Sequence, residues 1–305
     1  MKRAAGRKKV NKTRVAFILF VTVVPILNFL VFYVYTNFSS IMMAFTNNKG
    51  VVSLDNFIRF GKELANPASD FRIAIRNTMI TFGILVAVFP LKVLVSYFIY
   101  KKVPGYKFYR IVFFLPTIIF SVAIAMVFTR MVGTGGFIAQ TIGKMMHLDY
   151  VPELLADSRF ANYTIWFQML WLGFPGDLII WGGTFARIPE DVLESAQLDG
   201  VTWWTEFTKI IVPMVWPTVA LQMVLLVCGI FSASGAVWLL TEGNYNTQTI
   251  SSWMYKTLYT NSGGAYTSNV YNYMSAVGLV ITTIAILLST VVRKWTDKMF
   301  EEVEF

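Results

Sequence analysis

Six long stretches of this 305-residue chain are apolar and almost free of charge, and they limit its possible folds more than any other feature. A helix needs about 20 apolar residues to cross the hydrocarbon core of a membrane. The runs are continuous rather than alternating, which favours helices over a barrel. The sequence therefore predicts an all-α, polytopic membrane protein with six transmembrane helices. They are Val15 to Tyr35, Met79 to Tyr100, Ile111 to Phe128, Ala161 to Phe185, Met214 to Phe231 and Met274 to Val292.

The charge of the chain points to membrane lipid as a partner. Only 14% of the residues are charged, against about a quarter in soluble domains. The net charge of +9 does not indicate nucleic acid, because seven of the basic residues lie within residues 1–14, directly before an apolar run. Anionic lipid and retention during insertion explain a basic segment at that place. We expect an uncleaved first span, because the apolar core of a signal peptide is shorter, about 7–15 residues.

The distribution of Lys and Arg predicts the orientation of the spans, because basic residues are retained on the cytoplasmic side. With the N-terminus inside, sixteen of the 26 basic residues fall in the inner segments and nine in the outer ones. Both chain termini are therefore predicted to be cytoplasmic. The connection between the fourth and fifth spans is placed on the same side.

Cysteine and histidine each occur once, as Cys228 and His147. One chain cannot build a disulfide, a zinc cluster or a Cys/His nucleophile pair from them. A membrane enzyme needs several titratable groups gathered at one face. We therefore expect a non-catalytic chain that holds no cofactor or metal of its own.

The connection Ile188 to Pro213 differs from its apolar surroundings, with five carboxylates and one lysine. Pro189 suits the first helical position, and the acidic residues after it suit the positive end of a helix. An apolar face, Val192, Leu193 and Ala196, follows at helical spacing. Gly200 suits the left-handed position that ends a helix, and Thr202 can cap a second helix running to Ile211, before Pro213.

The predicted first helix suits a protein groove better than a lipid surface. A helix that lies on a membrane carries Lys and Arg along its polar face, whereas this flank holds Glu190, Asp191 and Glu194. Insertion of a small apolar face into a groove of another protein is a common recognition mode.

The spacing of this connection resembles the EAA loop of permease subunits of binding-protein-dependent ABC importers. Glu194, Ser195 and Ala196 are followed by three residues, Gly200, nine residues, Ile210, one residue, Val212 and Pro213. Ser195 and Val212 depart conservatively from the pattern. The segments from Asn77, Tyr109 and Leu239 resemble the maltose-type, carbohydrate-importing members, although Glu242, Gly243 and Asn244 stand where a Gly-Gly-Pro is usual. We name residues 188–213 the EAA loop.

The resemblance implies the type I ABC importer permease fold for residues 15–305, in the bacterial cytoplasmic membrane. It implies two ABC ATPase subunits that use ATP and magnesium, a second permease that is a different chain, an extracytoplasmic solute-binding protein and a sugar, in particular an oligosaccharide. In that family the EAA helix enters a cleft on the ATPase. We expect Glu194 to pair with a basic group there and Asp199 and Gly200 to shape the corner. The ATPase-coupling residues are Glu190, Leu193, Glu194, Ser195, Ala196, Asp199 and Gly200.

Lys92 and Asp177 are the ionisable residues inside the predicted spans. Such residues are functional or paired, because a desolvated charge is costly. Each lies about 12 Å from the cytoplasmic end of its span at 1.5 Å per residue, so they could neutralise one another. Alternatively, Lys92 extends to the inner interface and Asp177 lines the transport path.

Two matters stay open in the sequence. The tryptophans Trp166, Trp171 and Trp181 could stack on sugar rings or serve as interface anchors and packing residues. The alternative function is a stand-alone secondary transporter or channel, which is expected to show inverted repeats or several charges inside its spans.

Overall fold

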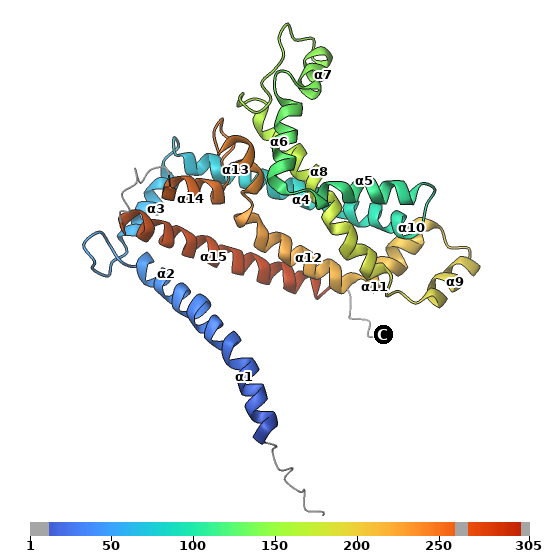
Figure 1. The fold of residues 1–305 in the computed structure, drawn as a ribbon, viewed down its shortest axis with the longest axis horizontal. Coiled ribbons are helices and arrows are strands. Elements are labelled where there is room, and N and C mark those ends of the chain that lie inside the picture. Colours follow the sequence, from blue (N-terminus) through green and yellow to red (C-terminus); the bar gives the residue numbers. More distant parts are fainter. Residues whose placement is uncertain (1–11, 260–267, 300–305) are drawn as a thin grey trace, which may run out of the picture. The chain divides into compact units, whose positions relative to one another are not determined.

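A computed structural model describes residues 12–259 and 268–299 (Figure 1). Within these ranges the chain is almost entirely helical, and the β-type pairing it contains is an isolated antiparallel bridge between Thr46 and Val52. The all-α prediction is therefore confirmed for the described part of the chain. Most of the basic N-terminus, residues 1–11, lies outside the described residues.

The helical elements run in chain order, with η marking π-helical (η1, η2) and 3₁₀-helical (η3) segments. They are α1 (Lys12–Asn28), η1 (Phe29–Tyr35), α2 (Thr36–Ala44), α3 (Asp55–Ala65), α4 (Asp70–Tyr100), α5 (Tyr106–Ile118), α6 (Ser121–Val132), α7 (Phe137–Met145), α8 (Ala161–Phe185), α9 (Glu190–Leu198), α10 (Trp203–Thr205), η2 (Glu206–Ile211), α11 (Val212–Met214), α12 (Trp216–Gly229), η3 (Ile230–Ser232), α13 (Gly235–Thr241), α14 (Ile250–Tyr259) and α15 (Ser268–Thr296).

The chain divides into two compact units, Met1–Lys62 with Ala265–Val280 and Glu63–Gly264 with Ile281–Phe305. In the described part of the first unit, α1, η1 and α2 follow one another without a break. Asn56 then fixes the turn that leaves α2, because its side-chain amide donates to the carbonyls of Ala44 at 3.0 Å and Thr46 at 2.9 Å. In the same unit, the Arg59 guanidinium lies 4.1 Å from the centre of the Tyr273 ring.

The second unit is organised around α4 and α8, which pack against each other. Ser69 caps α4 by accepting a hydrogen bond from the Phe71 amide, as expected for a serine at this position. Apolar side chains of both helices continue into the segments after α8 and form one interior group, which we name the α4–α8 cluster. Its buried members are Phe89, Val93, Tyr97, Trp181, Phe185, Ile188, Leu193, Phe207, Ile211, Val215 and Val219.

The third predicted span is wrong as one continuous helix. The chain forms α5 and α6 there, separated at Ile119 and Phe120, whose backbone is extended. Pro116 lies near the end of α5, and its lack of an amide hydrogen removes a helical hydrogen bond just before the break. The apolar stretch long enough to cross a membrane is instead Ser121–Met145.

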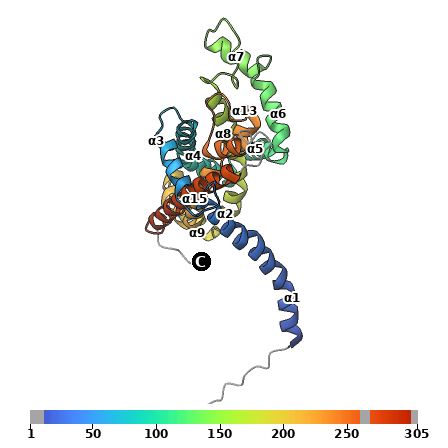
Figure 2. The ribbon, with the colours of Figure 1, turned by 90° about the vertical axis from the view of Figure 1, so that its left-hand side faces the viewer.

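A short helix, α7, follows α6. Ala139 of α7 is buried with Phe128 and Val132 of α6 and with Leu154 of the following connection. Figure 2 shows α7 at the far end of α6. This part of the second unit therefore has a small interior of its own, separate from the α4–α8 cluster.

The connection between α13 and α14 is fixed to α4 by hydrogen bonds. The Asn77 side-chain amide donates to the carbonyls of Asn246 at 2.7 Å and Gln248 at 3.0 Å, and the Ile250 amide donates to the Thr78 hydroxyl at 3.0 Å. The connection turns sharply, because Glu242, Tyr245 and Asn246 all have positive φ. At the other end of the same unit, the Trp216 indole donates to the Thr296 carbonyl at 2.8 Å.

Within the described residues, five segments are long and apolar enough to cross a membrane: Phe17–Ala44, Asp70–Tyr100, Ser121–Met145, Trp216–Thr241 and Asn269–Thr296. The predicted fourth span does form a helix, the 25-residue α8, but it is not among these five. Its polar and small residues, including Gln168, Gly173 and Asp177, lower its mean hydropathy. Multiple spans are confirmed, whereas the number six and the N-in, C-in orientation stay predictions.

Candidate functional site

The EAA loop begins where α8 ends in a tight turn. The Ile188 amide donates to the Phe185 carbonyl at 3.1 Å, and the buried Ile188 side chain joins the α4–α8 cluster. Pro189 occupies the N-cap of α9 rather than its first helical residue, so the predicted start is displaced by one position. Glu190 and Asp191 occupy the first turn, as predicted from the favourable interaction of carboxylates with a helix N-terminus.

The apolar face of α9 points into this chain rather than away from it. Leu193 is 9% exposed and Ala196 is 5% exposed, and Leu193 belongs to the α4–α8 cluster with Phe185 and Phe207. The helical spacing of these residues was predicted correctly. In this chain both side chains are buried, and Leu193 attaches α9 to the body of the second unit. Their assignment as ATPase-coupling residues stays a prediction.

The outward surface of α9 carries the side chains that are free to meet a partner. Glu190, Glu194 and Ser195 are exposed, and so are Leu198 and Asp199 at the corner after the helix. Leu198 is 89% exposed, an unusual position for a large apolar side chain. Sequence reasoning missed Leu198 because it lies off the predicted apolar face. Its place directly before the Asp-Gly corner was the available signal.

Gly200 has the conformation that the sequence predicted, with φ at +70°. The Val201 amide donates to the Ala196 carbonyl and the Gly200 amide to the Gln197 carbonyl, both at 3.1 Å, which is the hydrogen-bond pattern of a Schellman C-cap. A Cβ atom added at residue 200 would meet no atom within 4 Å. Glycine is therefore required by the left-handed backbone and not by lack of space.

The second limb of the loop returns to the α4–α8 cluster. Thr202 caps it by accepting from the Thr205 amide at 3.4 Å, which confirms the predicted cap. The helix then passes through the π-helical η2 and continues beyond Pro213, so it does not end at that proline. Phe207 and Ile211 are buried in the cluster, and Glu206 pairs with Lys101 at the end of α4 at 2.7 Å.

The predicted pairing of Lys92 with Asp177 is confirmed. The Lys92 ammonium lies 2.8 Å from Asp177 Oδ2 and also donates to the Gly173 carbonyl at 3.1 Å. The Lys92 side chain is 11% exposed and that of Asp177 is 31% exposed. The pair joins α4 to α8, and neither charge is left without a partner in their interior.

The three tryptophans considered for sugar stacking have different surroundings. Trp181 is 1% exposed and packs against the Phe89 and Phe185 rings, so its faces are occupied within this chain. Trp166 donates its indole hydrogen to the Thr81 hydroxyl at 3.0 Å. Trp171 packs against Phe128 and keeps 36% of its surface exposed. Packing therefore accounts for Trp181.

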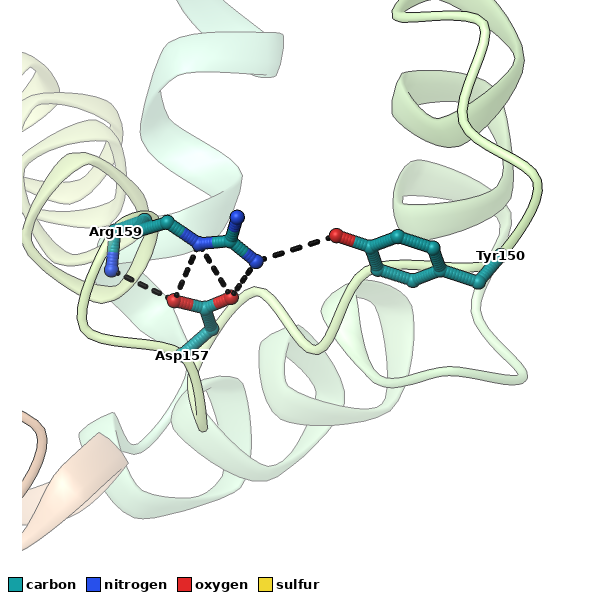
Figure 3. Close-up of polar contacts among 3 residues, drawn as sticks. All are labelled: Tyr150, Asp157 and Arg159. Carbon is teal, nitrogen blue, oxygen red and sulfur yellow. Dashed lines mark hydrogen bonds and ion pairs between the residues drawn. The ribbon is translucent and has the colours of Figure 1, made fainter.

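A polar group in the connection between α7 and α8 was not singled out in the sequence (Figure 3). Both oxygens of Asp157 accept from the Arg159 guanidinium, which also donates to the Tyr150 hydroxyl at 3.2 Å. The hydrogen bonds from Arg159 hold the pKa of Asp157 below its ordinary value, and the same contacts raise the pKa of Arg159. Tyr150 and Asp157 line an open recess of about 530 Å³ together with Tyr245.

Chemical groups that could hold a metal ion are not gathered in the part of the chain that the structure describes. No group of three or more His, Cys, Asp or Glu side chains is placed together there. The candidate functional features are the exposed, sharply turned EAA loop and two ion pairs, Lys92 with Asp177 and Lys101 with Glu206, on a helical scaffold.

Comparison with known proteins identifies the scaffold. The fold is similar to that of a chain in the crystal structure of a bacterial alginate ABC transporter in complex with an alginate pentasaccharide-bound periplasmic protein. The match covers 95% of this chain and 98% of the other, with a TM-score of 0.77 and 21% sequence identity. At that identity the match shows the fold alone.

Sequence relatives cover most of the chain. The multiple sugar-binding transport system permease protein MsmF of Streptococcus mutans is 22% identical over 279 residues, 90% of this chain and 93% of its own. The maltodextrin transport system permease protein MdxF of Bacillus subtilis is 27% identical over 215 residues, 66% of this chain and 48% of its own. The family model for the inner membrane component of binding-protein-dependent transport systems matches residues 79–301, which include the whole EAA loop. The chain therefore belongs to the family of binding-protein-dependent transport system inner membrane components.

Proposed function

We propose that this chain is one permease subunit of an ATP-driven ABC importer that passes a sugar, in particular an oligosaccharide, from an extracytoplasmic binding protein into the cytoplasm. Family membership supports the role in binding-protein-dependent transport. The names of MsmF and MdxF and the alginate pentasaccharide of the structural neighbour support a saccharide as the cargo. A second, different permease completes the transport path, and a separate ATPase hydrolyses MgATP.

The observation that carries this proposal is the exposed corner of the EAA loop on a rigid base. Leu193 fixes α9 to the α4–α8 cluster and Ala196 is buried as well, while Leu198 is 89% exposed close in sequence to the carboxylates Glu194 and Asp199. A highly exposed apolar side chain that has carboxylates close by in sequence suits a small pocket on a partner protein. We assign Leu198 to such a pocket of the ATPase and Glu194 to a basic group at its rim.

In this proposal the ATPase moves α9 and this chain passes the movement to its membrane helices. The chain itself breaks no bond and binds no nucleotide. Lys92 and Asp177 join α4 to α8, and we assign the pair to the wall of the transport path.

The test is purification of the tagged chain from its own membranes in mild detergent, followed by identification of the proteins that accompany it. We expect an ATPase and a second permease, together with ATP hydrolysis that increases when a sugar-loaded binding protein is added. Maltotetraose and an acidic oligouronate are suitable first probes. Solute transport by the purified single chain, without an ATP-hydrolysing companion, would instead support the stand-alone transporter.

A further inference from the structure

A second ion pair connects the EAA loop to α4. The Lys101 ammonium lies 2.7 Å from Glu206 Oε1, and the two side chains are 26% and 6% exposed. Lys101 directly follows α4, whereas Glu206 is the first residue of η2. The pair therefore joins the second limb of the EAA loop to the end of a long helix.

A carboxylate at this depth is not explained by packing. Removing a charge from water is costly, and an apolar side chain of similar volume often stabilises an interior as well as or better than an ion pair. What an ion pair adds is a strong, directional attachment that an apolar contact lacks. η2 is also a π-helical segment, a rare conformation that is frequent at functional sites.

The aromatic contacts around the pair reinforce the attachment. The Tyr97 ring, one turn before Lys101, lies 5.1 Å from the Phe207 ring, centre to centre. The Phe98 ring lies 5.4 Å from the Trp203 ring of α10. The end of α4 is thus held by several residues of the second limb, with the ion pair at its last turn.

We propose that Lys101 and Glu206 are positioning residues that transmit displacement of the EAA loop to α4. The proposal rests on the function proposed above, because the displacement comes from an ATPase. Lys92 lies nine residues before Lys101, about 13 Å along the helix at 1.5 Å per residue. Movement of the end of α4 therefore reaches the Lys92–Asp177 pair and, through it, α8.

The test compares the response of two segments to nucleotide in the complex purified through the tagged chain. Hydrogen–deuterium exchange is measured at residues 196–201, the tip of the EAA loop, and at residues 97–103, the end of α4, with and without MgATP and vanadate. The test variant is Lys101→Met with Glu206→Gln, which removes both charges and leaves neither buried alone.

We expect nucleotide to change the exchange rate at the tip in both the wild type and the neutral variant. At residues 97–103 the nucleotide-induced change in exchange rate should be about tenfold or more smaller in the neutral variant, the scale expected for one charge-assisted hydrogen bond. The reversed pair, Lys101→Glu with Glu206→Lys, should restore it. The matched control is Arg293→Gln with Asp297→Asn, which removes an exposed pair 3.9 Å apart and should leave both responses unchanged.

Three results would count against the assignment, and they can be told apart. A response at α4 equal to that of the wild type in the neutral variant would show that the link transmits nothing. Failure of the neutral variant to assemble with its companions would make the pair a folding element only. Absence of any response at the tip in the wild-type complex would refute the proposed function itself.

Discussion

The contribution of the Lys92–Asp177 ion pair to the stability of this chain can be measured by removing each charge in turn. Replacing Asp177 by Asn removes the carboxylate charge and leaves the Lys92 ammonium, 11% exposed, with neutral acceptors, which are the Gly173 carbonyl and the new side-chain amide oxygen. Breaking a buried pair costs about 3–5 kcal/mol, and the retained carbonyl contact reduces this cost to about 2–3 kcal/mol. The reverse change, Lys92→Met, leaves a carboxylate that is 31% exposed and should cost less.

The assay is thermal unfolding of the detergent-solubilised complex, followed by the fluorescence of the nine tryptophans of this chain. We expect the midpoint of Asp177→Asn to fall by about 5 °C, because 1 kcal/mol corresponds to about 2–4 °C in chains of comparable size. Lys92→Met should fall less, and the double variant should recover most of the loss. The double-mutant cycle then isolates the coupling of the two side chains.

Additive losses in the double variant would refute this reasoning, because they would mean that the two side chains act independently. A larger loss for Lys92→Met than for Asp177→Asn would also contradict it. That order is expected if the flexible Lys92 side chain finds water when its partner is removed.

Three further predictions follow from the EAA loop and the polar group beside α8. Gly200→Val places a β-branched residue at φ +70° and should uncouple ATP hydrolysis from uptake, whereas Gly200→Asn, which tolerates this conformation, should stay coupled; parallel ATPase and uptake assays decide. Leu198→Ser should leave the midpoint of unfolding unchanged and weaken ATPase binding by about tenfold, while Leu193→Ser, at a buried position, should destabilise by about 2–4 kcal/mol; pull-down titration and thermal unfolding separate the two. Because the pKa of Asp157 is lowered in the folded chain, its contact with Arg159 stabilises the loop above the unfolded pKa of about 4, and this stabilisation is lost as the pH falls through the lower folded pKa. Proteolysis of residues 149–160 should therefore increase below about pH 4. The Asp157→Asn variant should show no such increase.

Local signals predicted the parts of the EAA loop that depend on backbone conformation. Gly200, the Thr202 cap and the acidic first turn of α9 each follow from the chemistry of one or two neighbouring residues, and the structure has all three. The pairing of Lys92 with Asp177 was also accessible, because charges at similar depth in two spans have few other partners.

Tertiary packing decided the features that sequence reasoning missed. The face of α9 was visible as a pattern, but a pattern does not say whether the face is covered by the same chain or by a partner. Leu193 is buried in the cluster that also holds Phe207, whereas Leu198 is exposed, and the sequence pattern did not distinguish the two leucines. Lys101 and Glu206 are 105 residues apart, so no local spacing could predict their contact.

Helix continuity was the other source of error. The run Ile111 to Phe128 is apolar throughout, and hydropathy alone does not detect a change of direction inside it. Pro116 lies near the break, but proline alone did not signal it, because Pro90 and Pro175 stand inside α4 and α8 without interrupting them.

The central claim is that the exposed corner of the EAA loop is the site at which this chain meets its ATPase. The most direct test is photo-cross-linking in native membranes with benzoylphenylalanine at residue 198, and with residue 193 as the matched buried position. We predict that residue 198 captures the ATPase and that residue 193 captures only segments of this chain. Capture of an extracytoplasmic protein at residue 198, or of the ATPase at residue 193 alone, would contradict the claim.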